Sequence, residues 1–406
     1  MNFGENVMRL RRLAFVAAAA LTATGAMSGA VRAQASKGHV TYQVTVPVAD
    51  EAAAYQANAE HDGQSTAILS LPLHIRWIRN VGTQYYTSPV IANGKVAVSA
   101  SSSVIAMSAS KGNVLWSSPA PGGWSGLAEA NGIVYASQMY PGQLVEALDF
   151  STGRTVWSQA IPNLAFIEPP VVSGNVVYTV GGASSTTLFA FRAPDGAPVW
   201  ARPFTYEVQG TTPTVVNGRV YVSYVCSGTF AFSLAGGSLW HTPVQCSGDG
   251  GSAPAYCNGA LFVKGTIVKD HNDVDEGLML SPFSGAVLNT FQSSNSLPAC
   301  AAGREYITTG SGLQSVDLRS GQVVWSASVG MDEFLTPPLI VGNFVFAEGS
   351  SGTLYAYSVY TGTLLQAIAL GAPIYGLNGF QPVGLAAAQG ILVAPSGNNV
   401  VVLSGS

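Results

Sequence analysis

The chain has 406 residues and a formal net charge of −4 at pH 7, and only 9% of its residues are charged. This balance argues against nucleic acid and anionic membrane surfaces as partners, because both are bound by clustered Lys and Arg. Glycine contributes 46 residues, and β-branched residues dominate the apolar runs. A helical protein would carry far more Glu, Lys and Ala-Leu periodicity, so the composition favours an all-β fold rich in turns.

The N-terminus has the pattern of a signal peptide. Three arginines among the first 12 residues precede an apolar run from Leu13 to Met27, which is shorter than the ~20 residues that span a bilayer. Small residues offer cleavage sites after Ala33 or Ala35. We therefore expect residues 1–35 to be a signal peptide and the mature protein to be periplasmic or secreted. The alternative is an uncleaved N-terminal anchor.

We expect no membrane anchor in the mature chain. The first 225 residues contain no cysteine that could carry a lipid, and no later segment approaches the ~18 consecutive apolar residues of a transmembrane helix. The mature chain divides into an N-terminal lead-in, residues 36–70, and a repeat domain, residues 71–406. The five histidines show no metal-ligand spacing, so we expect His61 in the lead-in to be a structural hydrogen-bonding residue.

A turn that closes with an aromatic residue recurs along the repeat domain. In its clearest copy, Ala147 is followed by Asp149, then Thr152-Gly153, and then Trp157 four positions after the Gly. The period is about 41 residues, which indicates propeller blades. The Gly supplies the positive φ of the turn, and the Trp can lie across the interface with the next blade. The glycines are Gly112, Gly153, Gly196, Gly237, Gly285, Gly321 and Gly362; the predicted structural tryptophans are Trp77, Trp116, Trp157, Trp200, Trp240 and Trp325, with Asn289 and Gln366 where two are missing.

Each repeat has the pattern of four short strands, with tight Asn-Gly hairpins such as Asn93-Gly94 after the first. Leu73–Trp77 is an outer-strand copy with no strands before it. Ile391–Ala394 and Val400–Ser404 are inner-strand copies with no Trp strand after them. We therefore predict an all-β, eight-bladed β-propeller of four-stranded antiparallel blades, with the ring closed by pairing the N- and C-terminal segments in one blade. We also expect a monomer.

The repeat resembles the pyrroloquinoline-quinone-like, or quinoprotein-like, repeat family. The resemblance rests on Ala147–Trp157 and on the Pro89–Gly94 strand, and it covers roughly residues 50–406. The stretch from Tyr55 to Gly63 is similar to a lead-in found in exported proteins of this kind. The same repeat serves quinone-dependent alcohol dehydrogenases and a scaffold lipoprotein of outer-membrane assembly, so the fold does not settle the function. We expect the chain to be closer to the non-enzymatic scaffold members.

The quinone-dependent members imply a vicinal disulfide, a Ca²⁺ site and basic groups for the carboxylates of the quinone. This sequence has no Cys-Cys pair and is much shorter than those enzymes. Alignment of the repeats on Pro89 brings a single charged residue, Glu168, to the channel mouth, with no Arg or Lys to offset a tricarboxylate. We therefore predict no cofactor and do not expect pyrroloquinoline quinone. The aligned ring is Ser88, Gly126, Glu168, Thr212, Ala253, Leu297, Thr336 and Gly384.

The four cysteines can form disulfides after export. Cys226 and Cys246 fall in loops that share one face of a propeller, around blades 4 and 5. Cys257 and Cys300 fall at the first-to-second-strand turns of blades 5 and 6. We therefore predict the pairs Cys226–Cys246 and Cys257–Cys300; four free thiols are the alternative.

An acidic insertion between Lys269 and Gly277 lengthens the fifth repeat. Its oxygen-bearing side chains could hold Ca²⁺, but they lack the Asp-x-Asp-x-Asp-Gly order and the distal Glu of a calcium loop. We favour a solvated surface loop, with calcium as the alternative. The candidate ligands are Asp270, Asn272, Asp273, Asp275 and Glu276.

Aromatic residues precede the inner strands of three blades and should gather near one face of the channel. Because aromatics often anchor binding, we expect a non-enzymatic exported propeller that binds a protein or a small ligand through this face. Ordinary packing at the blade tops is the alternative for these aromatics, which are Tyr85, Tyr86, Trp124 and Phe334. The second hypothesis is an enzyme, either quinone-dependent or a hydrolase or lyase that uses Glu168 and Asp332 at the channel mouth.

Overall fold

The computed structural model divides the chain into two compact units, residues 1–49 and 50–406. In the first unit, β1 (Val31–Ser36) and β2 (His39–Val44) form an antiparallel hairpin. Residues 1–30, 37–38 and 45–49 lie outside the described residues, so the signal peptide stays a prediction. The second unit is described except for residues 101, 120–122, 139–141, 162–163, 165, 183–184, 206–210, 225–227, 245–252, 270–271, 293–296 and 376–382; only the backbone is described for 31–36, 39–44, 86–87, 124, 205, 265–269, 272–276 and 292.

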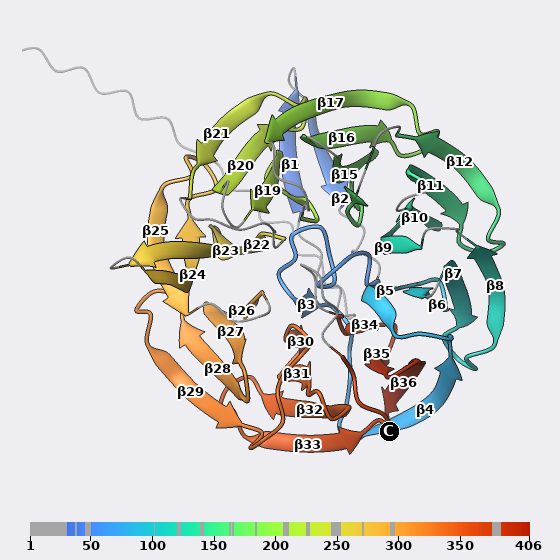
Figure 1. Ribbon diagram of the computed structural model, residues 1–406, viewed down its shortest axis with the longest axis vertical. Helices are drawn as coiled ribbons and strands as arrows, with labels where there is room; N and C mark the ends of the chain where they lie inside the picture. Colours follow the sequence, from blue (N-terminus) through green and yellow to red (C-terminus); the bar gives the residue numbers. More distant parts are fainter. Residues whose placement is uncertain are drawn as a thin grey trace, which may run out of the picture. The chain divides into compact units, whose positions relative to one another are not determined.

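Residues 50–406 form a ring of eight sheets, which confirms the predicted eight-bladed propeller (Figure 1). The sheets are antiparallel, except that the short strand Gln64–Ser65 pairs in parallel with Leu339–Val341. Within each of blades 1–7 the chain runs outward from the channel through four successive strands, and blades 3 and 7 each have one additional short inner strand. The first hairpin of blade 1 has positive φ at both turn residues, Asn93 (51°) and Gly94 (70°), as a two-residue hairpin turn requires. The strands of the first four blades are β5 (Tyr85–Ala92), β6 (Lys95–Ala100), β7 (Ser103–Ser108) and β8 (Val114–Pro119) in blade 1; β9 (Trp124–Ala130), β10 (Ile133–Gln138), β11 (Leu144–Asp149) and β12 (Thr155–Ala160) in blade 2; β13 (Phe166–Ile167), β14 (Val171–Ser173), β15 (Val176–Gly182), β16 (Thr186–Arg192) and β17 (Pro198–Thr205) in blade 3; and β18 (Thr214–Val216), β19 (Arg219–Tyr224), β20 (Gly228–Ser233) and β21 (Ser238–Thr242) in blade 4.

The last blade contains both ends of the ring. Its outermost strand, β4, comes from the start of the repeat domain and pairs with β36 near the C-terminus, with Asn80 opposite Asn399. This closure is the predicted one, and it leaves no unpaired end between the first and last blades. The remaining strands are β22 (Ala255–Cys257), β23 (Ala260–Lys269), β24 (Asn272–Leu280) and β25 (Val287–Gln292) in blade 5; β26 (Ala299–Ala301), β27 (Arg304–Thr309), β28 (Gly312–Asp317) and β29 (Val323–Ser328) in blade 6; β3 (Gln64–Ser65), β30 (Leu339–Val341), β31 (Phe344–Glu348), β32 (Thr353–Ser358) and β33 (Leu364–Ala369) in blade 7; and β34 (Ala386–Ala388), β35 (Ile391–Ser396), β36 (Asn399–Gly405) and β4 (Leu73–Asn80) in blade 8.

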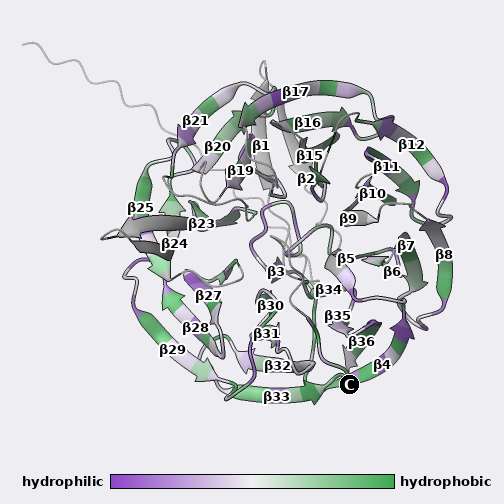
Figure 2. Cartoon of the chain, viewed as in Figure 1, coloured by the Kyte–Doolittle hydropathy of each residue, from purple (hydrophilic) through white to green (hydrophobic). Residues whose placement is uncertain are grey.

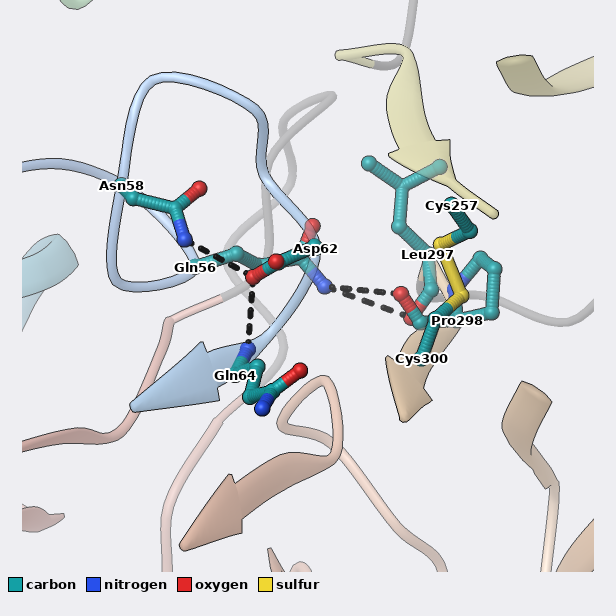
Figure 3. Close-up of a disulfide and its surroundings, with 8 residues drawn as sticks. All are labelled: Gln56, Asn58, Asp62, Gln64, Cys257, Leu297, Pro298 and Cys300. Atoms are coloured by element: carbon teal, nitrogen blue, oxygen red, sulfur yellow. Dashed lines mark hydrogen bonds between the residues drawn. A yellow bond between two sulfur atoms is a disulfide. The ribbon is translucent and has the colours of Figure 1, made fainter. Parts of the chain in front are cut away.

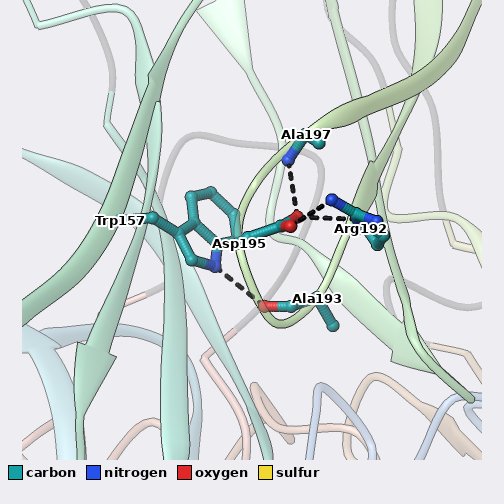
Figure 4. Close-up of polar contacts among 5 residues, drawn as sticks. All are labelled: Trp157, Arg192, Ala193, Asp195 and Ala197. Carbon is teal, nitrogen blue, oxygen red and sulfur yellow. Dashed lines mark hydrogen bonds and ion pairs between the residues drawn. The ribbon is translucent and has the colours of Figure 1, made fainter.

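The Trp of each repeat locks its blade to the next one, as the sequence predicts. Figure 4 shows Trp157 of blade 2, whose indole N–H donates to the Ala193 carbonyl of blade 3 at 2.8 Å. The ring lies against the turn Gly: a Cβ at Gly196 would lie only 2.5 Å from it. In the same turn Arg192 and Asp195 form an ion pair. The same bond is made by Trp77 to Ala109, Trp116 to Phe150, Trp200 to Leu234, Trp240 to Pro282 and Trp325 to Val359.

The turn Gly of blade 4 is Gly236, and the prediction of Gly237 is wrong by one residue. Gly236 has φ of 80°, and a Cβ there would lie 2.7 Å from Trp200. Trp240 therefore stands four positions after the turn Gly, as in the clearest copy.

The two seams without Trp differ from each other. Gln366 of blade 7 exchanges two hydrogen bonds with the backbone of Leu73, at 2.8 and 2.9 Å. Asn289 of blade 5 makes no such bond to blade 6: its Nδ2 is the nearest atom to the Cβ position of Gly321, at 3.9 Å. The missing Trp is thus replaced by two side-chain-to-backbone hydrogen bonds between blades 7 and 8, whereas its place is left unfilled between blades 5 and 6.

Hydrophobic clusters fill the seams between blades. One contains Val104 of blade 1 and Leu148 of blade 2, both fully buried. Figure 2 shows that hydrophobic residues also occur along the outermost strands, where Val287 and Leu288 are more than half exposed. Nowhere in the described residues is there a helix with the length and hydropathy needed to cross a membrane.

Candidate functional site

Residues 50–65 follow the inner edge of the ring, close to the first-to-second-strand turns, and Figure 1 shows this segment at the centre of the channel. Its backbone carbonyls accept hydrogen bonds from the innermost strands of one blade after another, and Ser65 donates to the Ala387 carbonyl of blade 8. We call residues 50–65 the plug. Its backbone bonds join Ala52 to Ile91, Ala53 to Glu129, Ala59 to Val215, Glu60 to Tyr256, Asp62 to Cys300 and Gly63 to Ile340, all at 2.7–3.0 Å.

His61 anchors the plug and is the structural hydrogen-bonding residue that the sequence predicts. It is fully buried, with Nδ1 2.7 Å from the Tyr55 carbonyl and Nε2 3.0 Å from the Pro213 carbonyl. Burial lowers the pKa of His61, and its bonds to these carbonyls only partly oppose that shift. With both ring nitrogens occupied, the imidazole has no position left for a metal ion.

A disulfide joins Cys257 and Cys300, as predicted, and so links the innermost strands of blades 5 and 6. Figure 3 shows it beside the plug, where the Gln56 amide donates to the Leu297 and Pro298 carbonyls. The other predicted pair, Cys226–Cys246, lies outside the described residues.

Two of the four aromatics predicted to form a binding face are core residues. Tyr85 is fully buried, and its hydroxyl donates to the Gly384 carbonyl at 3.1 Å. Phe334 is also buried and packs edge-on against Tyr355. The packing alternative therefore describes these two residues. The side chains of Tyr86 and Trp124 lie outside what the structure describes.

The aligned ring of residues at the channel mouth is almost wholly buried. Seven of its members are buried, and only Glu168 is partly exposed. The backbone N–H of Glu168 donates to the Val180 carbonyl at 2.8 Å. Ser88 and Gly384 are in close contact, because a Cβ at Gly384 would lie 2.0 Å from the Ser88 hydroxyl. The inner strands thus pack against one another at this level.

Asp332 links the loop before β30 to the turn between β31 and β32 in blade 7. Its carboxylate accepts hydrogen bonds from the Ser350 hydroxyl, from the backbone N–H and hydroxyl of Ser351, and from the Tyr355 hydroxyl. Partial burial acts to raise the pKa of Asp332, but the bonds from Ser351, Ser350 and Tyr355 outweigh it and lower the pKa. Asp332 is therefore ionised near neutral pH and already accepts from five donors, because the backbone N–H of Glu333 also donates to its Oδ1.

Sequence reasoning missed three buried glutamates. Glu129, Glu305 and Glu348 are each at most 2% exposed, and each has at least one carboxylate oxygen without a hydrogen-bond partner. Burial raises the pKa of Glu129 and of Glu305 to about 7, and it raises the pKa of Glu348 strongly. Comparing the same strand position across the eight repeats would have revealed them, since their counterparts are almost all apolar or small.

The acidic insertion lengthens the second and third strands of blade 5, so the expectation of a loop is corrected. Lys269 pairs with Asn272 at the end of the β23–β24 hairpin. Asp270 lies outside the described residues. Only the backbone is described for Asn272, Asp273, Asp275 and Glu276, so the calcium hypothesis stays a prediction.

A family model described as outer membrane protein assembly factor BamB matches residues 78–159, 141–366 and 231–405. The chain belongs to this family. The matches run from the outermost strand of blade 8 through to β36, so every blade of this BamB-family chain contributes to them. They agree with the quinoprotein-like repeat identified from the sequence.

Similar curated proteins include an outer membrane protein assembly factor and a hydrolase. BamB of Yersinia pestis is 26% identical over 208 residues, which are 46% of this chain and 52% of that protein. Tetrathionate hydrolase of Acidithiobacillus ferrooxidans is 31% identical over 139 residues, 29% of this chain and 28% of that protein. The chain spans about half of the first of these relatives and less of the second.

Solved structures share the ring architecture of this BamB-family chain. BamB from Moraxella catarrhalis superposes with a TM-score of 0.62 at 15% identity, covering 82% of this chain and 97% of that one. A quinohemoprotein alcohol dehydrogenase from Comamonas testosteroni gives a TM-score of 0.65 at 14% identity, covering 88% and 81%. At such identities the similarity establishes the fold alone.

Proposed function

We propose that this chain is a non-enzymatic scaffold that acts outside the cytoplasm and binds another protein through the loop face of its ring. The loop face carries the connections between blades and the turns between the second and third strands of each blade. The plug lies on the opposite side of the ring, near the first-to-second-strand turns. Membership of the BamB family supports a scaffold, and the signal-peptide pattern supports export.

The observation that carries the proposal is a set of cross-linked loops over blades 7 and 8. Gln84 exchanges two hydrogen bonds with the backbone of Tyr375, at 2.7 and 2.9 Å, and so joins two inter-blade connections. Ser350 bonds to Glu333 on one side and to Ile374 on the other. Together with Asp332, these bonds fix loops from three blades in one arrangement.

Two large side chains project from these fixed loops. Met331 is fully exposed, and Tyr375 is 67% exposed. Met and Tyr are enriched at protein interfaces, where they fill pockets of a partner. Because the backbone beneath them is already held, little conformational entropy is lost when a partner binds. A rigid loop surface with projecting Met and Tyr suits protein recognition.

The same loops argue against the enzyme hypothesis. Asp332, one of its two candidate carboxylates, has its pKa lowered and accepts hydrogen bonds from five donors. A general base works best with a pKa near the working pH and with reach to its substrate. Asp332 therefore fits a structural role in the loop.

Site-specific photo-crosslinking tests the proposal. A photoreactive residue replaces Tyr375 in one variant and Phe283 in the control, which is 66% exposed in a third-to-fourth-strand turn on the opposite side of the ring. We expect one discrete protein adduct from position 375 in intact cells and none from position 283. Equal adduct patterns from both positions would contradict recognition through the loop face.

Two further measurements test export and the absence of catalysis. We expect the full chain in the periplasmic fraction or the medium, and a chain lacking residues 1–35 in the cytoplasm. Purified protein should neither hydrolyse tetrathionate nor oxidise alcohols when supplied with pyrroloquinoline quinone and Ca²⁺. Turnover of either substrate above a boiled control would refute the non-enzymatic role.

A further inference from the structure

The seam between blades 5 and 6 departs from the repeat at two positions. On the blade 5 side, Asn289 stands where six other seams have Trp. On the blade 6 side, Glu305 occupies the second residue of β27, opposite Cys300 on β26. The corresponding residues of the other blades are all Val or Leu: Val96, Val134, Val177, Val220, Leu261, Val345 and Leu392.

A cavity of about 180 Å³ lies between the blades here, because Asn289 is much smaller than the Trp of the other seams. Its walls include Asn289, Phe291, Glu305, Leu318 and Gly321. An apolar cavity of about 150 Å³ is large enough to bind benzene. The space therefore suits a molecule with one or two aromatic rings.

The residues around this cavity are equivalent to the residues that surround an indole ring in the other seams. In the Trp-bearing seams the ring lies on the turn Gly and donates its N–H to a carbonyl of the same turn, at 2.8–3.1 Å. Here the turn Gly is Gly321 and the corresponding carbonyl belongs to Leu318. Asn289 does not fill the place, since its Oδ1 accepts from the N–H of Thr290 instead. A planar ring with an N–H fits the vacant position.

The two acidic side chains of the cavity favour a positively charged ligand. Glu305 is 2% exposed, and its Oε2 has no hydrogen-bond partner. Asp317 also lines the cavity, and among the described residues no Lys, Arg or His does. A buried carboxylate without a partner is costly, and an ammonium group that pairs with it removes that cost.

We propose that the seam between blades 5 and 6 is a binding site for a small aromatic amine, with the ring in the vacant tryptophan position and the ammonium group on Glu305. The site is separate from the loop face and does not depend on the scaffold role. Cys257–Cys300 holds the inner end of the seam, so that the blades stay together although the indole is missing.

Calorimetric and NMR titrations with tryptamine and with indole at about pH 8, above the pKa of Glu305, test this site. We expect both to bind the wild-type protein, with tryptamine at least tenfold tighter because a hydrogen bond to a charged group adds about tenfold or more in affinity. Glu305→Gln should remove the advantage of tryptamine and leave indole binding unchanged. Asn289→Trp should abolish binding of both, because its own indole fills the cavity.

Trp325→Asn provides a matched control at the next seam, where Val345 stands in place of Glu305. It should create a second site that binds indole without a preference for tryptamine. Failure of the wild-type protein to bind either probe at millimolar concentration would overturn the proposal. So would tryptamine binding that survives Asn289→Trp, or a tryptamine preference that survives Glu305→Gln. If Asn289→Trp does not fold, the Glu305→Gln comparison still decides.

Discussion

Cys257 and Cys300 are bonded to each other across the seam in which Asn289 stands at the tryptophan position. The disulfide thus joins the same two blades that lack the Trp contact between them. At the other seam without Trp, the side chain of Gln366 bonds to the backbone of Leu73 in both directions. Each missing indole is compensated by a different kind of bond.

The disulfide should therefore contribute strongly to stability. Its two cysteines are 43 residues apart, and loop-closure entropy for a loop of that length corresponds to roughly 4 kcal/mol. We expect the double variant Cys257→Ala, Cys300→Ala to lose about 3 to 4 kcal/mol in the free energy of unfolding by denaturant titration. Hydrogen exchange should become faster in β22 and β26 before other inner strands. A loss below about 1 kcal/mol would show that the seam is held by other contacts.

Asn289→Trp should stabilise the protein by about 1 to 2 kcal/mol, since it fills a cavity with an apolar ring. The measurement belongs near pH 5, where Glu305 is protonated because burial raises its pKa to about 7. Gln366→Trp is the matched control at the second seam. It should destabilise by about 1 to 3 kcal/mol, because it removes both bonds to Leu73. Equal effects of the two variants would contradict the difference between the seams.

Glu305 should make stability depend on pH. Burial raises the pKa of Glu305 from 4.5 to about 7, so the folded protein keeps a proton that the unfolded chain releases. The free energy of unfolding should therefore fall as pH rises from about 4.5 to about 7, with this group contributing about 3 kcal/mol. Glu305→Gln should reduce that fall, whereas Glu333→Gln, at an exposed loop position, should not. Denaturant titrations across this range measure the difference.

His61 should act in the opposite direction. Burial lowers the pKa of His61, so on acidification the unfolded chain binds a proton that the folded plug does not. The free energy of unfolding contributed by His61 is complete above pH 6.5, the ordinary pKa of His, and decreases as pH falls below it. His61→Gln should flatten this acid-side loss and should cost about 1 to 3 kcal/mol at pH 8, because a buried carbonyl loses its donor. His74→Gln, at an exposed position of β4, is the control; a parallel pH profile for both variants would contradict the role of His61.

The repeated part of the fold could be predicted because each repeat obeys local rules. Positive φ requires Gly at the outer turn, and a Trp four residues later covers it. The error at Gly237 has a simple cause. Gly236 and Gly237 are adjacent, and only the backbone shows that Gly236 takes the positive φ under Trp200.

The parts that break the repeat were harder to predict. Glu305 directly follows Arg304 and a turn, so the local sequence indicates a polar strand end; its burial depends on blade 5, which packs over it. The course of the plug depends on bonds to residues hundreds of positions away, such as Ser65 to Ala387, and no periodic signal encodes them. The aromatic side chains of Tyr85 and Phe334 were correctly placed near the inner strands, but sequence alone could not separate packing from binding.

The plug also constrains the order in which parts of the protein can fold. It stands at the start of the described ring, yet its partners include Ile340 and Ala387, which lie hundreds of residues later in the chain. Contacts of such long range form slowly, since loop closure costs entropy before any bond is made. The plug can therefore complete its bonds only after the last blade has formed. Until β36 is available to pair with β4, the ring remains an open arc, and the two ends of the ring become native together.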